Sequence, residues 1–193
     1  MTSSPCAKAA GAIVATAAAL PLMALPALAI DKPSGEPATR AVSSIDWAAA
    51  TSAFHEASAD DRTLTAAFLA TEPDGFDDMA MAVMILGTNT AAGLPAFRGQ
   101  RDAYTAYYQL EGAQVSVLGS RTHLVDVPGL TFKHQARSYE SIGDGADHML
   151  SRFGGSYTLR ITCDAPTEDT RCIKPDYLAE LAHSLTVVKG ADQ

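Results

Sequence analysis

The sequence lacks the short motifs that mark the commonest catalytic sites. It has no G-x-S-x-G and no S-x-x-K, the patterns that place a serine nucleophile in many hydrolases. The glycine pairs Gly143-x-Gly145 and Gly154-Gly155 are too short to cradle a phosphate and indicate hairpin turns instead. These absences disfavour nucleophilic hydrolases and nucleotide-binding enzymes, and we expect no cofactor.

Basic residues are also scarce. The chain has 14 Lys and Arg against 22 Asp and Glu, a formal charge of −8. Without the signal peptide described next, residues 1–29, which contain one lysine and no acid, the formal charge is −9. An acidic surface repels phosphate backbones and anionic lipid headgroups. We therefore expect neither nucleic acid nor a membrane surface as a partner.

The N-terminus has the parts of a signal peptide. Lys8 precedes an apolar run over residues 12–25, and Ala27-Leu28-Ala29 is a small-x-small pattern read by signal peptidase. Pro26 favours an extended chain there, so we predict cleavage after Ala29. A retained membrane anchor is the alternative, but the run is short and has no cationic stop-transfer flank. The sequence predicts a mature chain in the periplasm or secreted, without a stable membrane anchor.

Few cysteines remain after that cleavage. Cys6 lies in the signal peptide with no lipobox around it, so only Cys163 and Cys172 belong to the mature chain. Two cysteines nine residues apart in an oxidising compartment predict a disulfide. Closing a loop of this length stabilises the fold by about 3 kcal/mol. A redox-active pair is the alternative, although the spacing is not C-x-x-C.

The mature chain fits a single domain preceded by a leader. Residues 30–43 combine prolines with polar residues, which indicates a flexible leader. The domain is expected over residues 44–190. Ser44 is placed to cap a first helix over residues 45–57, where small and apolar residues recur at helical spacing.

The next segments are less regular. Residues 62–71 fit both a helical stripe and a strand alternation, and helix is favoured. The apolar run 79–86, bounded by turn residues, predicts a buried strand. A long irregular connection is expected after it, through Gly93, Pro95 and Gly99.

A hairpin is predicted around Glu111-Gly112. With these two residues as the loop, Tyr108 faces Val115 and Ala106 faces Val117, so one side of the strand pair is apolar and the other polar. One register sorts both strands, which is the consistency expected of a half-buried antiparallel pair.

A second hairpin and a meander follow. With Gly154-Gly155 as the loop, Arg152 pairs with Tyr157. Upstream, residues 131–142 alternate, and Gly143-Asp144-Gly145 connects them to the same strand. We therefore expect three antiparallel strands in succession.

The end of the chain completes the predicted class. Pro175 suits the first turn of a helix that carries a leucine stripe. Hairpins followed by a packing helix predict an α+β domain, an antiparallel, meander-rich sheet with helices packed against it. The stretch SYTLRI at 156–161, a loop, this helix and SLTVV at 184–188 resemble the end of PsbP-like α/β/α sandwich domains. The resemblance covers less than half of the mature chain and implies an accessory or binding module, with no catalytic residue to carry over.

One pair of residues is a candidate for chemistry. A three-residue loop at 143–145 places Glu140 opposite His148 on the apolar face. A partly buried acid would raise the pKa of the imidazole, and the pair could transfer protons in a small periplasmic hydrolase or sense pH. A structural ion pair, or another register that separates the two residues, is the plainer alternative.

A metal site is a further hypothesis. His134 and His148 could approach across the meander with Glu140 as a third ligand. Scattered histidines are more often surface or core residues, so the pattern favours no metal. No two of the five histidines have the spacing of a metal motif: His55, His123, His134, His148 and His183.

Tyrosines on the first hairpin suggest a recognition surface. Tyr104 and Tyr108 fall on its core face, whereas Tyr107 points outward among polar residues. An outward tyrosine can anchor a partner, although a single exposed aromatic is also ordinary. Our leading hypothesis is an exported, non-catalytic binding or accessory protein of the cell envelope, with a protein or small-molecule partner there.

Overall fold

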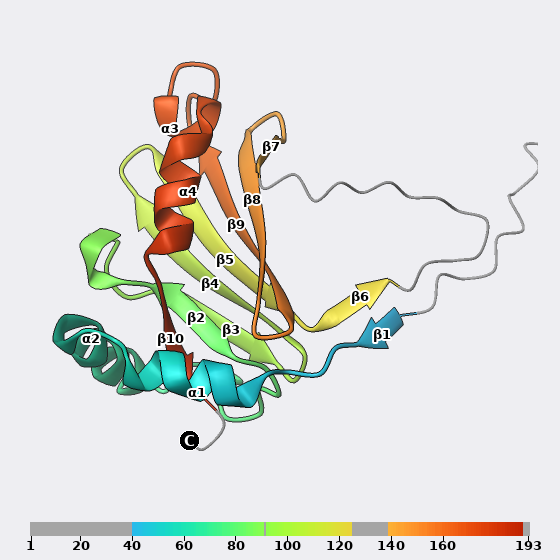
Figure 1. Ribbon diagram of the computed structural model, residues 1–193. Coiled ribbons are helices and arrows are strands. Elements are labelled where there is room, and N and C mark those ends of the chain that lie inside the picture. The colour runs from blue at the N-terminus through green and yellow to red at the C-terminus, as the bar shows by residue number, and fades with distance from the viewer. Residues whose placement is uncertain (1–39, 91, 125–138, 191–193) are drawn as a thin grey trace, which may run out of the picture. The chain divides into compact units, whose positions relative to one another are not determined.

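The computed structural model describes residues 40–90, 92–124 and 139–190. Its largest element is a six-stranded sheet in which every neighbouring pair is antiparallel (Figure 1). Helices pack against this sheet, which confirms the predicted α+β class. In order across the sheet, the strands are β3 (Ala96–Gln100), β4 (Ala103–Leu110), β5 (Ala113–Ser120), β9 (Gly155–Cys163), β8 (Gly145–Arg152) and β7 (Tyr139–Ser141).

Two short strand pairs and the helices complete the described ranges. β2 pairs with β10, and β1 pairs with β6, both antiparallel. None of the described helices is both long and apolar enough to cross a membrane. The remaining elements are β1 (Arg40–Val42), α1 (Trp47–His55), α2 (Ala59–Leu69), β2 (Val83–Leu86), η1 (Thr88–Thr90), β6 (Thr122–Leu124), α3 (Thr170–Ile173), α4 (Pro175–His183) and β10 (Leu185–Lys189).

The first hairpin forms in the predicted register. Tyr108 pairs with Val115 and Ala106 with Val117, and Glu111-Gly112 is the loop between β4 and β5. Gly112 has a φ of 68°, in the left-handed region that a glycine enters without a Cβ penalty. Alternation over two strands and a two-residue loop were therefore enough to predict the pairing.

The second hairpin forms two residues away from its predicted register. Arg152 pairs with Gly155 and not with Tyr157. The loop is Phe153-Gly154, whose φ values of 51° and 79° are those of a tight turn matched to the twist of the strands. The predicted loop, Gly154-Gly155, left Phe153 in the strand. In the structure Phe153 adopts a left-handed conformation, which is unusual for a residue with a Cβ atom, and is the first residue of the loop. A shift of two residues preserves the facing of every side chain, so the predicted apolar face is correct.

The predicted helices in the N-terminal half are confirmed, with one different cap. Helix α1 is capped by Asp46, which accepts a hydrogen bond from the Ala49 N–H at 3.0 Å, and not by Ser44. The ambiguous stretch 62–71 is helical as far as Leu69, within α2. Ser58 caps this helix by accepting the N–H of the third residue after it.

Two expectations for irregular chain are wrong. Residues 96–100 form β3, although the connection there was expected to lack structure. Residues 40–42, at the end of the expected leader, form β1 and pair with β6. Both strands are short and lack apolar alternation, and β1 meets a partner about 80 residues later, so their own sequences carry little strand signal. The predicted signal peptide and residues 30–39 of the leader lie outside the described residues.

Three buried tyrosines join the large sheet to β2. Strand β2 pairs with β10 along one edge, and the hydroxyls of Tyr104, Tyr108 and Tyr157 reach backbone groups that face away from β10. The bonds run from Met84 N–H to Tyr104 Oη (2.9 Å), from Tyr104 Oη to the Met84 carbonyl (2.7 Å), from Leu86 N–H to Tyr108 Oη (2.8 Å), and from Tyr157 Oη to the Ala82 carbonyl (2.9 Å).

These tyrosine hydroxyls do for β2 what a neighbouring strand would do. Strand β2 is fully buried, so each backbone N–H or C=O without a partner would cost free energy. Burial also raises the pKa of all three phenols, because the charged phenolate would have to form away from water. The tyrosines therefore serve as structural donors and acceptors.

The predicted disulfide is confirmed. Cys163 ends β9 and Cys172 lies in α3, with their Cα atoms 6.4 Å apart. The enclosed loop is tied to the first hairpin by Arg171, whose guanidinium donates to the Glu111 carbonyl at 2.9 Å and pairs with Asp169. The disulfide holds the start of α4 next to the end of β9.

Candidate binding site on the open sheet face

The two faces of the large sheet differ in what covers them. Along β9, buried residues alternate with exposed or half-buried ones. Helix α4 lies across the face with the buried residues (Figure 1), and its Leu178 and Leu181 pack into the core there. We call the other side the open sheet face. Its cross-strand rows are Arg98, Thr105, Leu118 and Thr158, and next to it Ala96, Tyr107, Ser116, Arg160 and Asp147.

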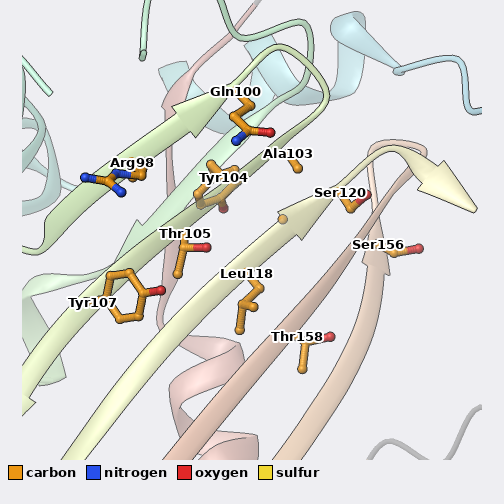
Figure 2. A pocket seen from close by; sticks show the side chains of 11 residues that line it. Arg98, Gln100, Ala103, Tyr104, Thr105, Tyr107, Leu118, Ser120, Ser156 and Thr158 are labelled. Atoms are coloured by element: carbon orange, nitrogen blue, oxygen red, sulfur yellow. The ribbon is translucent and has the colours of Figure 1, made fainter. Parts of the chain in front are cut away.

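A hollow of about 440 Å³ lies on this face. Figure 2 shows side chains from β3, β4, β5 and β9 around it, with Thr105 and Leu118 on neighbouring strands of its floor. We call it the Tyr107 hollow. Its lining residues are Arg98, Gln100, Ala103, Tyr104, Thr105, Tyr107, Leu118, Gly119, Ser120, Ser156 and Thr158.

Tyr107 has the outward position predicted from the sequence. It is 43% exposed, whereas Tyr104 and Tyr108 on the same strand are 3% and 1% exposed. The two inward hydroxyls bond to β2. The Tyr107 hydroxyl makes no hydrogen bond to the described part of the protein, so its ring and its hydroxyl are both available to a ligand.

Other polar groups in the hollow are also unused. Thr105, Ser156 and Thr158 make no side-chain hydrogen bond within the described ranges, and neither does the Gln100 carboxamide. The Ser120 hydroxyl is engaged with its neighbour Thr122. A hydroxyl both donates and accepts, and a carboxamide offers both kinds of group. The hollow therefore presents a set of neutral hydrogen-bonding groups beside one aromatic ring.

Charge is held at the margins of the hollow. Arg98 lies at its rim, 3.8 Å from the Asp74 carboxylate, with both side chains more than three-quarters exposed. A pair this exposed contributes little to stability. Farther along the face, Arg160 forms two hydrogen bonds to Asp147, of 2.8 and 2.7 Å. Among the residues that the structure describes, no acidic side chain lines the hollow itself.

The predicted pairing of Glu140 with His148 is wrong. His148 lies opposite Tyr139, and Glu140 lies opposite Asp147. The Ile142 N–H donates to the Gly145 carbonyl, so the loop between β7 and β8 contains two residues and not three. A shift of one residue turns a side chain to the other face of a sheet. Glu140 is therefore exposed on the open face, and the proposed proton-transfer pair does not form.

The surroundings of His148 also differ from the prediction. Its Nδ1 atom is buried and has no hydrogen-bond partner among the described residues. Desolvation lowers the pKa of this imidazole, and repulsion from His183 lowers it further. The sequence predicted a raised pKa from a neighbouring acid. The correction follows from the loop length, because it removes the acid from this face.

The metal hypothesis gains no support from the described residues. They contain no group of three or more histidine, cysteine, aspartate or glutamate side chains arranged to hold an ion. His134, the second proposed ligand, lies outside the described residues. Of the proposed set, Glu140 and His148 are on opposite faces of the sheet.

Two residues of the hollow were not predicted from the sequence. Arg98 and Gln100 belong to β3, which was expected to be irregular chain, so their place beside Tyr107 was not foreseen. The side chains from β4 and β5 follow from the predicted hairpin. Because β3 pairs with β4 through the short turn before Ala103, a weak hairpin signal around Arg101-Asp102 was the available clue.

Comparisons with known proteins add no relatives. No protein-family model, no curated protein and no solved structure matches the chain. The resemblance to PsbP-like domains therefore stays a prediction, and the function has to be argued from the site.

Proposed function

We propose that this chain is an exported, non-catalytic binding protein of the cell envelope that recognises its ligand at the Tyr107 hollow. The observation that carries the proposal is Tyr107 itself, an exposed aromatic ring beside hydroxyl and carboxamide groups that have no partner among the described residues. Exposed aromatics flanked by hydrogen-bonding groups are typical of recognition surfaces.

The proposed location rests on three features. The sequence predicts a signal peptide cleaved after Ala29, which would deliver the mature chain to an oxidising compartment. The bond between Cys163 and Cys172 is of the kind that persists in such a compartment. The described helices include none suited to crossing a membrane.

The chemistry of the hollow favours binding over catalysis. In the described part of the chain its lining has hydroxyls but no histidine, lysine, cysteine or carboxylate that could activate one of them or exchange a proton. Tyr104 also lines the hollow, and its hydroxyl is committed to both backbone groups of Met84.

The same chemistry favours a neutral carbohydrate as the ligand. Within the described ranges the lining carries one formal charge, on Arg98, and that charge lies beside Asp74. Neither an anion nor a cation gains much from such a surface. A sugar ring offers an apolar face that can lie on Tyr107 and hydroxyls that can bond to Thr105, Ser156 and Thr158.

An affinity measurement on the processed, exported chain tests this function. Calorimetry with neutral oligosaccharides, namely maltohexaose, cellohexaose and chitohexaose, should find at least one that binds. Tyr107→Ala should weaken that binding roughly tenfold, as expected when an aromatic anchor is removed. Gln109→Ala is the matched control, because Gln109 lies on the same strand and face but outside the hollow. Absence of binding by all three sugars, or equal losses in the two variants, would contradict the proposal.

A further inference from the structure

A second cavity, of about 570 Å³, shares no lining residue with the Tyr107 hollow. Its walls come from the link between α1 and α2, from η1, from the turn between β8 and β9, and from the junction of α4 with β10. The volume falls in the range of small-molecule sites. We call it the Arg152 cleft. The polar residues that matter below are Glu56, Asp61, Asn89, Arg152 and His183.

Arg152 brings an uncompensated positive charge to this cleft. Its guanidinium has no carboxylate partner within the described ranges, whereas Arg121, Arg160 and Arg171 each have one. Its Nη1 atom lies 3.9 Å from the Met84 sulfur, a weak acceptor. A guanidinium in a cleft with its donors unused is suited to bind a carboxylate through two parallel hydrogen bonds.

The turn that carries Arg152 is held firmly. The Asp46 N–H donates to the Phe153 carbonyl at 3.0 Å. Gly154 packs so closely on the Ser44 carbonyl that a Cβ atom there would lie 2.1 Å from its oxygen. Phe153 keeps a left-handed φ of 51° in this turn. Arg152 therefore projects from a fixed backbone, which lowers the ordering cost of binding.

The opposite charge comes from Glu56, in the link between α1 and α2, and from Asp61, in the first turn of α2. Asp61 accepts hydrogen bonds from Ser58 Oγ (2.8 Å), Thr88 N (3.0 Å) and Thr88 Oγ1 (3.1 Å). Partial burial raises the pKa of Asp61, but these bonds outweigh it and the pKa lies below its ordinary value. Glu56 accepts one bond, from Ser52 at 2.8 Å. Neither carboxylate has a cationic partner in the described part of the chain.

We propose that the Arg152 cleft binds a small zwitterion, an α-amino acid, with the carboxylate on Arg152 and the ammonium group at Asp61 and Glu56. Charges of both signs line one cleft without neutralising each other, so a plain anion meets two acids and a plain cation meets a guanidinium. Only a ligand with both charges is complementary to the whole lining. This site is independent of the function proposed for the sheet face.

The remaining lining indicates the side chain of the ligand. Ala53, Ala57 and Phe153 contribute apolar surface, Asn89 and His183 contribute polar atoms, and the lining residues Leu185 and Val187 are almost fully buried. An amino acid with an apolar or aromatic side chain fits such a mixed wall. L-phenylalanine is therefore the probe of choice.

A matched ligand series tests the proposal on the processed full chain. Calorimetry and amide NMR would compare L-phenylalanine with 3-phenylpropionate, which lacks the ammonium group, and with 2-phenylethylamine, which lacks the carboxylate. Both analogues should bind at least about tenfold more weakly than the amino acid, since each loses one charged contact. The NMR shifts should include Asn89 and His183.

Variants assign each contact. Arg152→Gln should weaken L-phenylalanine at least about tenfold without weakening 2-phenylethylamine, which no longer meets the guanidinium, a difference that simple misfolding would not produce. Glu56→Gln should likewise weaken L-phenylalanine without weakening 3-phenylpropionate, which then meets one acid fewer. Arg101→Gln, at an exposed arginine outside both cavities, and Tyr107→Ala should change nothing.

Two results would overturn the zwitterion site. One is the absence of any amide NMR shift with L-phenylalanine at about 10 mM, a concentration high enough to detect millimolar affinity. That result would mean that Arg152 and the two acids neutralise each other in solution. The other is equal binding of 3-phenylpropionate, which would make the cleft a plain anion site. Loss of sugar binding at Tyr107 would affect neither conclusion.

Discussion

The hydroxyl of Tyr108 should make a measurable contribution to stability through a single backbone group. Replacing Tyr108 with phenylalanine keeps the ring in place and removes only the acceptor for the Leu86 N–H, now 2.8 Å away. Leu86 is 1% exposed, so water cannot replace the lost partner. A buried donor left without a partner costs about 1–3 kcal/mol.

Tyr104 should be more sensitive and Tyr107 insensitive. Tyr104→Phe removes both an acceptor for the Met84 N–H and a donor to the Met84 carbonyl, so we expect about 2–4 kcal/mol. Tyr107→Phe should stay within about 0.5 kcal/mol of the parent, because its hydroxyl bonds to no described residue. Three tyrosines on one strand thus give a graded series with an internal control.

Urea unfolding at fixed pH measures this series. Trp47, the single tryptophan, lies in α1 and reports the transition by fluorescence, and linear extrapolation gives the free energy of unfolding. In thermal unfolding, the Tyr108→Phe loss corresponds to a fall in Tm of roughly 3–10 °C. Equal stabilities for the Tyr107 and Tyr108 variants would refute the idea that tyrosine hydroxyls satisfy the buried edge of β2.

Three further outcomes follow from the structure. Because burial raises the pKa of the three buried phenols, their neutral forms stabilise the fold below pH 10, and this stability should be lost as the pH rises above 10. Measuring Tm across pH 8–12 checks this, and a Tm that does not change over that range would contradict it. Replacing Cys163 and Cys172 together with serine should lower the free energy of unfolding by about 3 kcal/mol, and an unchanged urea midpoint would show that the bond adds no stability. His148 should titrate below 6.5 by NMR, and its neutral form should stabilise the fold above that pH; Glu140→Gln should leave the titration unchanged, and a coupled titration would restore the rejected pairing.

The first hairpin shows which parts of the fold a single sequence can predict. Its strands alternate over eight residues each, and the two-residue loop sets one register that puts Ala106, Tyr108, Val115 and Val117 together on the buried face. The second hairpin has the same alternation, but Phe153 adopts a conformation that is rare for a residue with a Cβ atom, so its pairing was two residues out. In both hairpins the predicted face of each side chain was correct. The first register was right, and the second was shifted by two residues, which leaves every side chain on the same face.

Two errors in the sequence-based prediction affected the functional site: the length of the loop between β7 and β8, and the missed strands β1 and β3. One residue fewer in the loop after β7 moved Glu140 to the face opposite His148 and ended the catalytic hypothesis. The short strands β1 and β3 have no alternation of their own, so only their partners reveal them. Tyr107 could be predicted because it lies on the legible hairpin.

The Arg152 cleft lay beyond sequence reading for a related reason. Glu56 and Asp61 lie where α1 ends and α2 begins, Arg152 lies at the end of β8 about 90 residues later, and no local pattern connects these segments. Only the docking of the turn on the start of α1 brings them to one cavity.

The most direct test of the account is to map where a neutral oligosaccharide binds. In an amide NMR titration of the processed chain with the tightest of the three hexasaccharides, we expect the largest shifts at Thr105, Tyr107, Leu118 and Thr158, on four neighbouring positions of the open sheet face. Shifts confined to the helix-covered side of the sheet, or none at saturating sugar, would contradict the claim that this face is the binding surface.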